Sequence, residues 1–162
     1  MSKSHEVQET GSGRSLAKGL LAGLIGGLVA TAAKNFAEKI YPPRTHSGPQ
    51  PPKVLVEKIA GHELVESQKE VATEAIQWGL GALTGAAYGA LVEYYPAASV
   101  RDGAGFGMAL SSLTHGTVLP AMGLAAKPED QTSRERTSEM ATHVVYGVVT
   151  ETVRRVVRRI LR

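Results

Sequence analysis

Apolar residues gather in four stretches along the chain, and polar or proline-containing segments separate these stretches. Each stretch has the length of a helix, and no strand–helix–strand pattern surrounds any of them. The pattern predicts an all-α fold, a bundle of about four transmembrane helices at residues 16–38, 72–95, 103–126 and 138–160.

Glycine recurs at every fourth position in the first two predicted helices. The first carries Gly19, Gly23 and Gly27, and the second carries Gly81, Gly85 and Gly89. Residues four apart share one helix face, and small residues let two helix backbones approach closely. We therefore expect these glycines to act as a glycine zipper, packing helices within the chain or between copies of it.

The composition indicates what surrounds these helices. Hydrophobic residues make up 43% of the chain but aromatic residues only 5%, and 18 residues are glycine. Glycine in a helix exposed to water costs about 0.8–1.0 kcal/mol relative to alanine, whereas it is common between membrane helices. We expect a disordered tail at 1–14 and a single helical membrane domain at 15–162. The mean hydropathy of −0.08 leaves a soluble or membrane-surface bundle as an alternative.

The segment after the first helix is rich in proline and charge. Five prolines between residues 42 and 52 predict a loop without regular secondary structure, since proline removes a backbone donor. A polar, amphipathic helix should follow the loop, on the membrane surface or against the bundle. Ser15 and Ser138 are suited to cap the first and last helices, and Pro96 should end the second.

The net charge of +3 is concentrated at the C-terminus. One face of the last helix carries five arginines: Arg154, Arg155, Arg158, Arg159 and Arg162. Such a helix is typical of entry into an anionic headgroup layer. We expect the lipid bilayer as partner and no nucleic acid, although an arginine patch also suits nucleic acid. Four spans put both termini on one side, and the arginines favour the cytoplasmic face of a bacterial inner membrane.

Ionisable residues interrupt the apolar helices. Glu139, His143 and Glu151 lie on the last helix, His115 near the middle of the third and Glu93 near the end of the second. A charge exposed at the bilayer centre costs at least ~2.5–3.5 kcal/mol, so these groups should face the bundle interior. Histidine changes charge near pH ~6.5, so the cluster is a candidate proton- or ion-responsive site.

Other interpretations of these residues stay open. Glu139 and His143 can form a structural polar clip between helices, worth roughly 0.6 kcal/mol. A metal site or bis-histidine haem from His115 and His143 is a weaker alternative, because two histidines without tight spacing are weak evidence. The sequence has no HExxH or GxSxG motif, and it lacks cysteine. We expect no enzyme activity, no catalytic residues, no metal and no cofactor.

Four segments of the chain, in order, resemble the YagU-type bacterial inner-membrane proteins. They are "GLLAGLIGGLVATAAKNFAEKIYPPRT", "AYGALVEYYP", "HGTVLPAMGLAAKPED" and "SEMATHVVYGVVTETVRRVVRR". The resemblance implies a small polytopic inner-membrane protein and no particular reaction. The family has a longer, more aromatic region between its first two helices, whereas here that region is shorter and rich in Lys and Glu.

Together these features lead us to expect a non-enzymatic protein of envelope or stress physiology. Its intramembrane His/Glu cluster would respond to pH or protons. A homo-oligomer, or an accessory subunit of a larger membrane complex, is the alternative, in which the polar groups satisfy partner helices.

Overall fold

The computed structural model describes residues 13–42, 51–61 and 64–161, and every regular element in these ranges is helical. The expected all-α fold is therefore confirmed. The predicted tail at 1–14 lies outside the described residues except for its last two positions. In chain order the elements are α1 (Leu16–Ile40), α2 (Pro51–Ala60), α3 (Glu66–Tyr94), a 3₁₀ segment η1 (Pro96–Gly103), α4 (Ala104–Leu113), a π-helical turn η2 (Thr114–Val118), α5 (Leu119–Ala121) and α6 (Ser133–Ile160).

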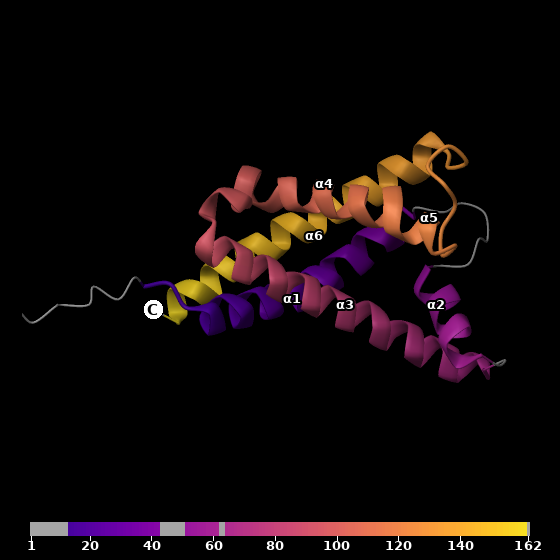
Figure 1. The fold of residues 1–162 in the computed structure, drawn as a ribbon, viewed down its shortest axis with the longest axis horizontal. Helices are drawn as coiled ribbons and strands as arrows, with labels where there is room; N and C mark the ends of the chain where they lie inside the picture. Colours follow the sequence, from indigo (N-terminus) through magenta and orange to yellow (C-terminus); the bar gives the residue numbers. More distant parts are fainter. Residues whose placement is uncertain (1–12, 43–50, 62–63, 162) are drawn as a thin grey trace, which may run out of the picture.

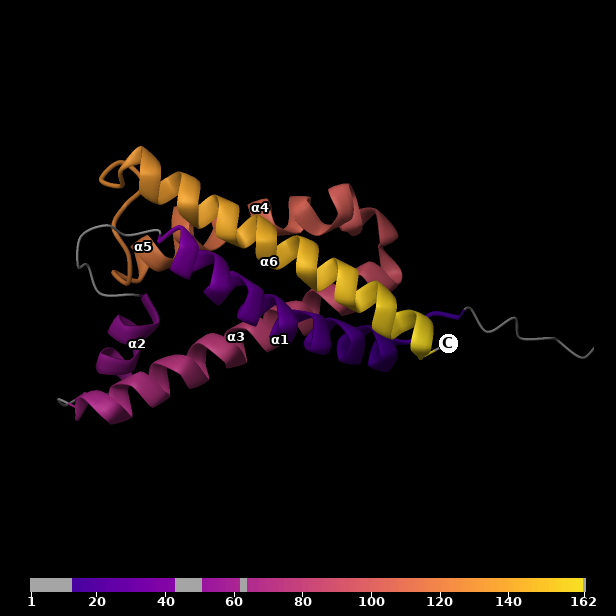
Figure 2. The same cartoon turned by 180° about the vertical axis from the view of Figure 1, so that it is seen from behind.

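Helix α1 is the centre of the bundle. It packs along α3 on one side and along α6 on the other, and α4 packs on α6. Helices α3 and α4 join through η1 and diverge toward α2 and α5, which both opposite views show (Figure 1, Figure 2). Both ends of the described chain lie at the same end of the bundle, as the sequence led us to expect (Figure 1).

The helices differ from the predicted ranges in ways that local chemistry explains. Helix α6 begins at Ser133 because Thr132 and Glu135 form a capping box, in which each side chain bonds the backbone of the other residue. The predicted cap at Ser138 is therefore wrong, and its hydroxyl instead donates to the Tyr41 carbonyl oxygen at 2.8 Å. Ser15 does cap α1, accepting from the Lys18 amide.

The proline-rich segment is not wholly irregular. Pro51 and Pro52 open α2, where a missing backbone N–H removes no helical hydrogen bond. The polar helix expected after them is interrupted at Gly61, whose φ of 66° lies in the left-handed region. Helix α2 is thus the first part of the expected polar helix, and the part from Glu66 onward is continuous with α3.

The two glycine stripes meet each other inside the chain. A Cβ atom added to Gly19 would lie 3.0 Å from Glu93 Cβ, and one added to Gly23 would lie 2.8 Å from Gly89 Cα. At that separation the backbones of α1 and α3 touch, with no room for larger side chains. This contact explains why α1 needs small residues on the face that it turns to α3.

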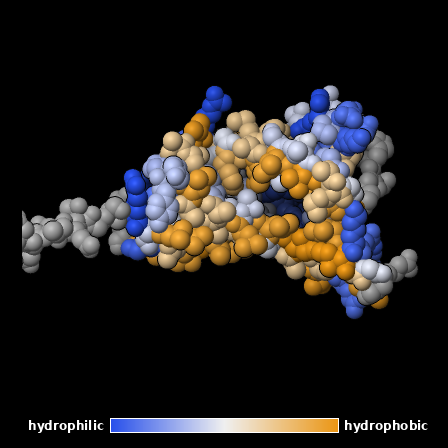
Figure 3. Space-filling view, in the orientation of Figure 1, coloured by the Kyte–Doolittle hydropathy of each residue, from blue (hydrophilic) through white to orange (hydrophobic). Residues whose placement is uncertain are grey.

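The distribution of residues between interior and surface is inverted. Most of the buried apolar side chains are small, being Ala or Val. Buried polar or charged residues outnumber the buried apolar ones in the described chain. Large apolar side chains lie outside instead: Leu83 is 68% exposed, Phe36 66% and Ile40 70%. Hydrophobic residues cover the middle of the molecule and hydrophilic ones gather toward its two ends (Figure 3).

A span test by length and composition picks out one helix, α1, within the described residues. The other three predicted spans do not meet it. Helix α6 carries too many charges, and the expected third span is divided into α4, η2 and α5. Hydropathy alone therefore does not support the expectation of four membrane-spanning helices.

Candidate functional site

His115, Glu139 and His143 come together, as the sequence led us to expect. His115 Nδ1 lies 3.1 Å from Glu139 Oε2, and both side chains are largely buried. The His115 and His143 rings meet edge to face with centroids 5.0 Å apart. The carboxylate of Glu139 contacts His115, so the contact between helices joins η2 to α6.

The π-helical turn η2 places His115 in this contact. Pro120 has no backbone N–H and cannot donate to the carbonyl four residues earlier, so the helix widens ahead of it. The Leu119 amide donates to the Thr114 carbonyl five residues back, and the Thr117 hydroxyl donates to Ser112 O at 3.1 Å. Single π-helical turns are frequent at functional sites.

His143 is anchored through one ring nitrogen. Its Nδ1 lies 2.7 Å from the backbone carbonyl oxygen of Glu139, one turn earlier in α6. A carbonyl only accepts, so Nδ1 carries the proton, and in the neutral imidazole Nε2 is left as an acceptor. The described chain makes no hydrogen bond to that Nε2 atom.

The cluster forms part of the wall of a cavity of about 910 Å³. The cavity lies among α1, α2, α3, α6 and the α4–α5 arm, which consists of α4, η2 and α5. Its polar wall includes Lys34, Gln77, Trp78, His115, Glu139 and His143. In the space-filling view a hollow with a hydrophilic interior opens between α3 and the α4–α5 arm, within a hydrophobic surround (Figure 3).

Glu151, which the sequence grouped with the histidines, belongs to a different cluster. Its carboxylate is 0% exposed and accepts two hydrogen bonds from Arg154, at 2.7 and 2.8 Å. Arg155 also binds this carboxylate and reaches Asp102 in η1 at 2.7 Å. The buried Tyr88 side chain lies near the same carboxylate. This cluster joins α6 to η1 and α3.

Glu93 is likewise engaged far from the histidines. Arg158 Nε donates to Glu93 Oε2 at 2.8 Å, and the Ser15 amide donates to Oε1 at 2.7 Å. The pair ties the ends of α1, α3 and α6 together. Arg154, Arg155 and Arg158 thus make ion pairs within the protein. Arg159 is exposed, and Arg162 lies outside the described residues.

Sequence reasoning missed the cavity and several of its residues. No pattern in the sequence places Lys34, Gln77 or Trp78 beside the histidines, yet all three line the cavity. These residues line one cavity with the histidines because α3 and α4 diverge, and no periodic pattern in the sequence indicates that divergence. The described residues contain no group of three or more His, Asp or Glu side chains able to hold a metal ion.

Family comparison covers most of this architecture. A family model for proteins of unknown function, DUF1440, matches residues 28–152. The chain belongs to the DUF1440 family. The DUF1440 region begins within α1 and ends in α6, so it includes His115, Glu139 and His143 but stops short of the arginines. Comparison with curated proteins and with solved structures finds no match.

Proposed function

We propose that this DUF1440 protein is a small polytopic inner-membrane protein of the YagU type, with a proton-responsive site at His115, Glu139 and His143. The observation that carries the proposal is the inverted distribution of residues. A protein in water buries its large apolar side chains, whereas this chain exposes them and buries carboxylates, imidazoles and hydroxyls.

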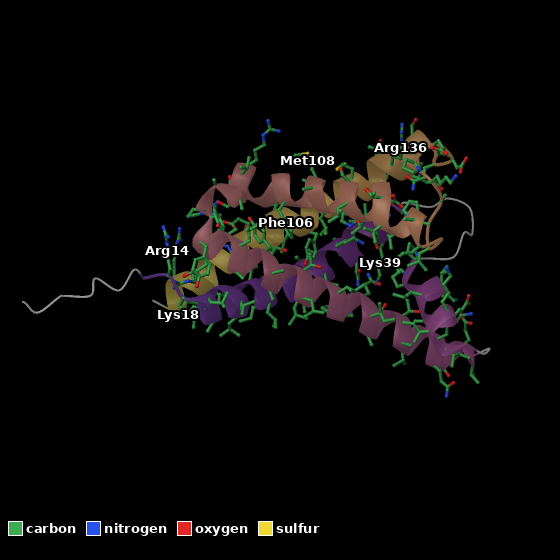
Figure 4. The ribbon with its side chains drawn as sticks, viewed as in Figure 1. Arg14, Lys18, Lys39, Phe106, Met108 and Arg136 are labelled. Atoms are coloured by element: carbon green, nitrogen blue, oxygen red, sulfur yellow. The ribbon has the colours of Figure 1, made fainter. Side chains whose placement is uncertain are left out.

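A bilayer accounts for that distribution. Lipid surrounds the exposed apolar side chains favourably, and polar groups within it need partners inside the protein. Charged side chains mark the two ends of the bundle: Arg14 and Lys18 lie at one end, Lys39 and Arg136 at the other, and Phe106 between them (Figure 4). The apolar length between these ends belongs to α1, α3, the α4–α5 arm and α6.

The ion pairs reduce the cost of charged residues in α3 and α6. Glu93 and Glu151 each accept a pair of hydrogen bonds from an arginine, so their carboxylates do not face lipid. Pairing of this kind is how ionisable residues persist in membrane helices. A test by composition counts these paired residues as charges, and α6 therefore does not pass it.

Proton uptake at the histidine cluster would change the forces between helices. Protonated His115 attracts the Glu139 carboxylate, which draws η2 toward α6. Protonated His143 meets the Lys34 ammonium of α1 and the His115 ring, which repel it. The two histidines thus act in opposite directions on the packing of α6, and the balance sets the response.

Membrane extraction tests the placement. The full chain, expressed in a bacterium, should stay with the membrane pellet at alkaline carbonate pH and dissolve only with detergent. Release by carbonate would favour a surface-bound bundle, and recovery from the soluble fraction as a monomeric helical protein would favour a soluble one.

Growth at low and neutral external pH tests the proton response. A deletion strain should show a pH-dependent defect that wild-type protein restores and that His143→Ala and Glu139→Gln, at matched expression, do not. Full restoration by both variants would make the cluster a structural clip. Purification from native membranes separates the autonomous protein from an accessory subunit, because only the subunit brings a stoichiometric partner.

A further inference from the structure

We propose that the cavity beside His143 binds a neutral, hydroxyl-bearing amphiphile, whose hydroxyl donates a hydrogen bond to His143 Nε2. The inference deepens the proposed function, because it assigns a ligand class to the same cluster and assumes the bilayer as the source of that ligand. Four features of the cavity lead to it: its polar wall, the tautomer of His143, the local charge and the apolar rim.

Four hydroxyl and indole donors on the cavity wall are already in use. The Tyr146 hydroxyl donates to Gly81 O at 2.5 Å, and the Trp78 indole N–H donates to Glu74 Oε2 at 2.9 Å. The Thr31 and Thr114 hydroxyls donate to carbonyls of their own helices. Each of these groups has a single proton to donate. What these groups still offer the cavity is acceptor capacity.

His143 adds a further acceptor, its Nε2 atom, to which no described residue donates. Its Nδ1 proton is held by the Glu139 carbonyl at 2.7 Å, so the bare nitrogen is Nε2, on the far side of the ring. The residue is buried and lines the cavity. An acceptor that opens on a cavity can take a hydrogen bond from a ligand there, so a ligand that donates to it gains affinity.

The charge around His143 selects a neutral donor. Lys34 on α1 lies near enough to act on the charge of His143, so a ligand ammonium at Nε2 would face a second cation. A carboxylate has no proton to give to Nε2 and would face the Glu139 carboxylate close by. Lys34 itself is paired with Glu38 and is not free to attract an anion. A hydroxyl meets neither repulsion.

The rim and size of the cavity suit the rest of an amphiphile. Phe36 and Leu80 line the cavity and are exposed on the apolar outer surface, so an alkyl or ring tail can pass between them into lipid. A volume of about 910 Å³ lies within the ~300–1,000 Å³ range of small-molecule sites. The hollow in Figure 3 opens on this hydrophobic face.

Trp78 provides the test, because it is the only tryptophan in the chain and lines the cavity. The full chain would be placed in phosphatidylcholine nanodiscs, whose lipid has no free hydroxyl, at pH above the imidazole range. Three probes with the same terminally brominated chain, an alcohol, a carboxylate and a primary ammonium, would then be titrated. Bromine quenches tryptophan on contact, so quenching reports occupancy.

We expect saturable quenching by the alcohol, with the carboxylate and ammonium at least about tenfold weaker, the effect of one hydrogen bond left unmade. His143→Phe keeps the ring volume and removes the acceptor, and it should weaken the alcohol about tenfold. Ala32→Phe fills the cavity from an exposed position on α1 and should weaken all three probes. At a pH acidic enough to protonate His143, Nε2 donates instead of accepting, so the alcohol should lose its advantage.

Equal quenching by all three heads would overturn the proposal, since it would reflect partition of the tail alone. A preference for the ammonium would assign the site to its carboxylates, and a preference for the carboxylate at neutral pH would assign it to Lys34; either result contradicts it. No saturable quenching at all would leave only solvent in the cavity. The proton response is read separately, from the pH dependence of Trp78 emission without any probe.

Discussion

Gly27 and Gly85 face each other at backbone contact across the α1–α3 interface. A Cβ atom added to Gly85 would lie 2.6 Å from Gly27 Cα, and one added to Gly27 would lie 3.0 Å from Gly85 Cα. Both distances are below those that real Cβ atoms adopt or at their limit, and the neighbours are main-chain atoms that cannot rotate away. The separation of α1 and α3 is therefore set by the absence of side chains.

The first prediction follows from this contact. Gly85→Ala should destabilise the bundle by about 1–3 kcal/mol, because the helices must shift apart, and Gly85→Leu by more. Gly79 is the matched control, since it lies in the same helix and a Cβ there would meet nothing within 4 Å. Gly79→Ala should stabilise the protein by about 0.5–1 kcal/mol. Thermal unfolding in one detergent compares them; equal midpoints for Gly85→Ala and wild type would refute the close contact.

The second prediction concerns the buried carboxylate of Glu151. Glu151→Gln keeps the shape but leaves the buried Arg154 guanidinium without a counter-charge, so it should cost about 3–5 kcal/mol of unfolding free energy. Asp102→Asn removes the exposed partner of Arg155 and should cost less than about 1 kcal/mol. Denaturant titration of both variants gives the difference. Similar losses of unfolding free energy in the two variants would mean that the Glu151–Arg154 and Asp102–Arg155 pairs are equally solvated.

The sequence predicts much of the fold but divides its site incorrectly. Gly23 and Gly89 each belong to a series of glycines at every fourth position. Such spacing is a local property of the sequence, and it predicts a helix-packing stripe directly. Glu151 is grouped with His143 on sequence grounds because both are ionisable residues on the last predicted helix that should face the bundle interior. The Glu151–Arg154 pair is local, three residues apart on α6, but the elements packed against the two residues differ: η1 beside Glu151 and η2 beside His143. A one-dimensional pattern contains no information about that.

The third prediction tests the origin of the π-helical turn. Pro120→Ala restores a backbone donor and should let α4 continue as a regular helix through residues 114–121. A π-helical turn accommodates one extra residue compared with an α-helical turn. Conversion to a regular α-helix therefore rotates His115 by about 100° relative to α6, and its contact with Glu139 is lost. The variant should be as stable as wild type or more so, yet its Trp78 emission should no longer depend on pH near neutrality. A retained pH dependence would show that the π turn does not position His115.

The fourth prediction concerns α2, which lies outside the proposed spans. Hydrogen bonding to Lys53, and its charge, hold the pKa of Glu66 below its usual value. A lowered folded-state pKa means that the pair contributes stability above the unfolded-state value and loses it as pH falls through the lowered pKa. Proteolysis of the α2 segment should therefore quicken in acid. Glu66→Gln should show the fast rate already at neutral pH, and an unchanged rate would show that this pair does not hold α2.

The last prediction distinguishes a structural clip from a proton-responsive contact at His115 and Glu139. The His143 ring contacts His115, and Lys34 acts on the charge of His143; both residues remain in the first set of variants. A double-mutant cycle with His115→Gln and Glu139→Gln, measured by unfolding in detergent, gives the coupling energy. Interacting neighbours typically show about 0.5–3 kcal/mol.

If the contact responds to protons, this coupling has a defined sign with pH. A charged imidazole attracts the carboxylate, so the coupling should be large at low pH and fall as pH rises and His115 loses its proton. A neutral clip would give a small coupling at every pH. His143→Gln serves as the matched background, because repeating the cycle in it removes the neighbouring imidazole; the coupling at low pH should then increase, since His143 no longer competes for the proton. A flat profile in both backgrounds would leave the pair a structural contact.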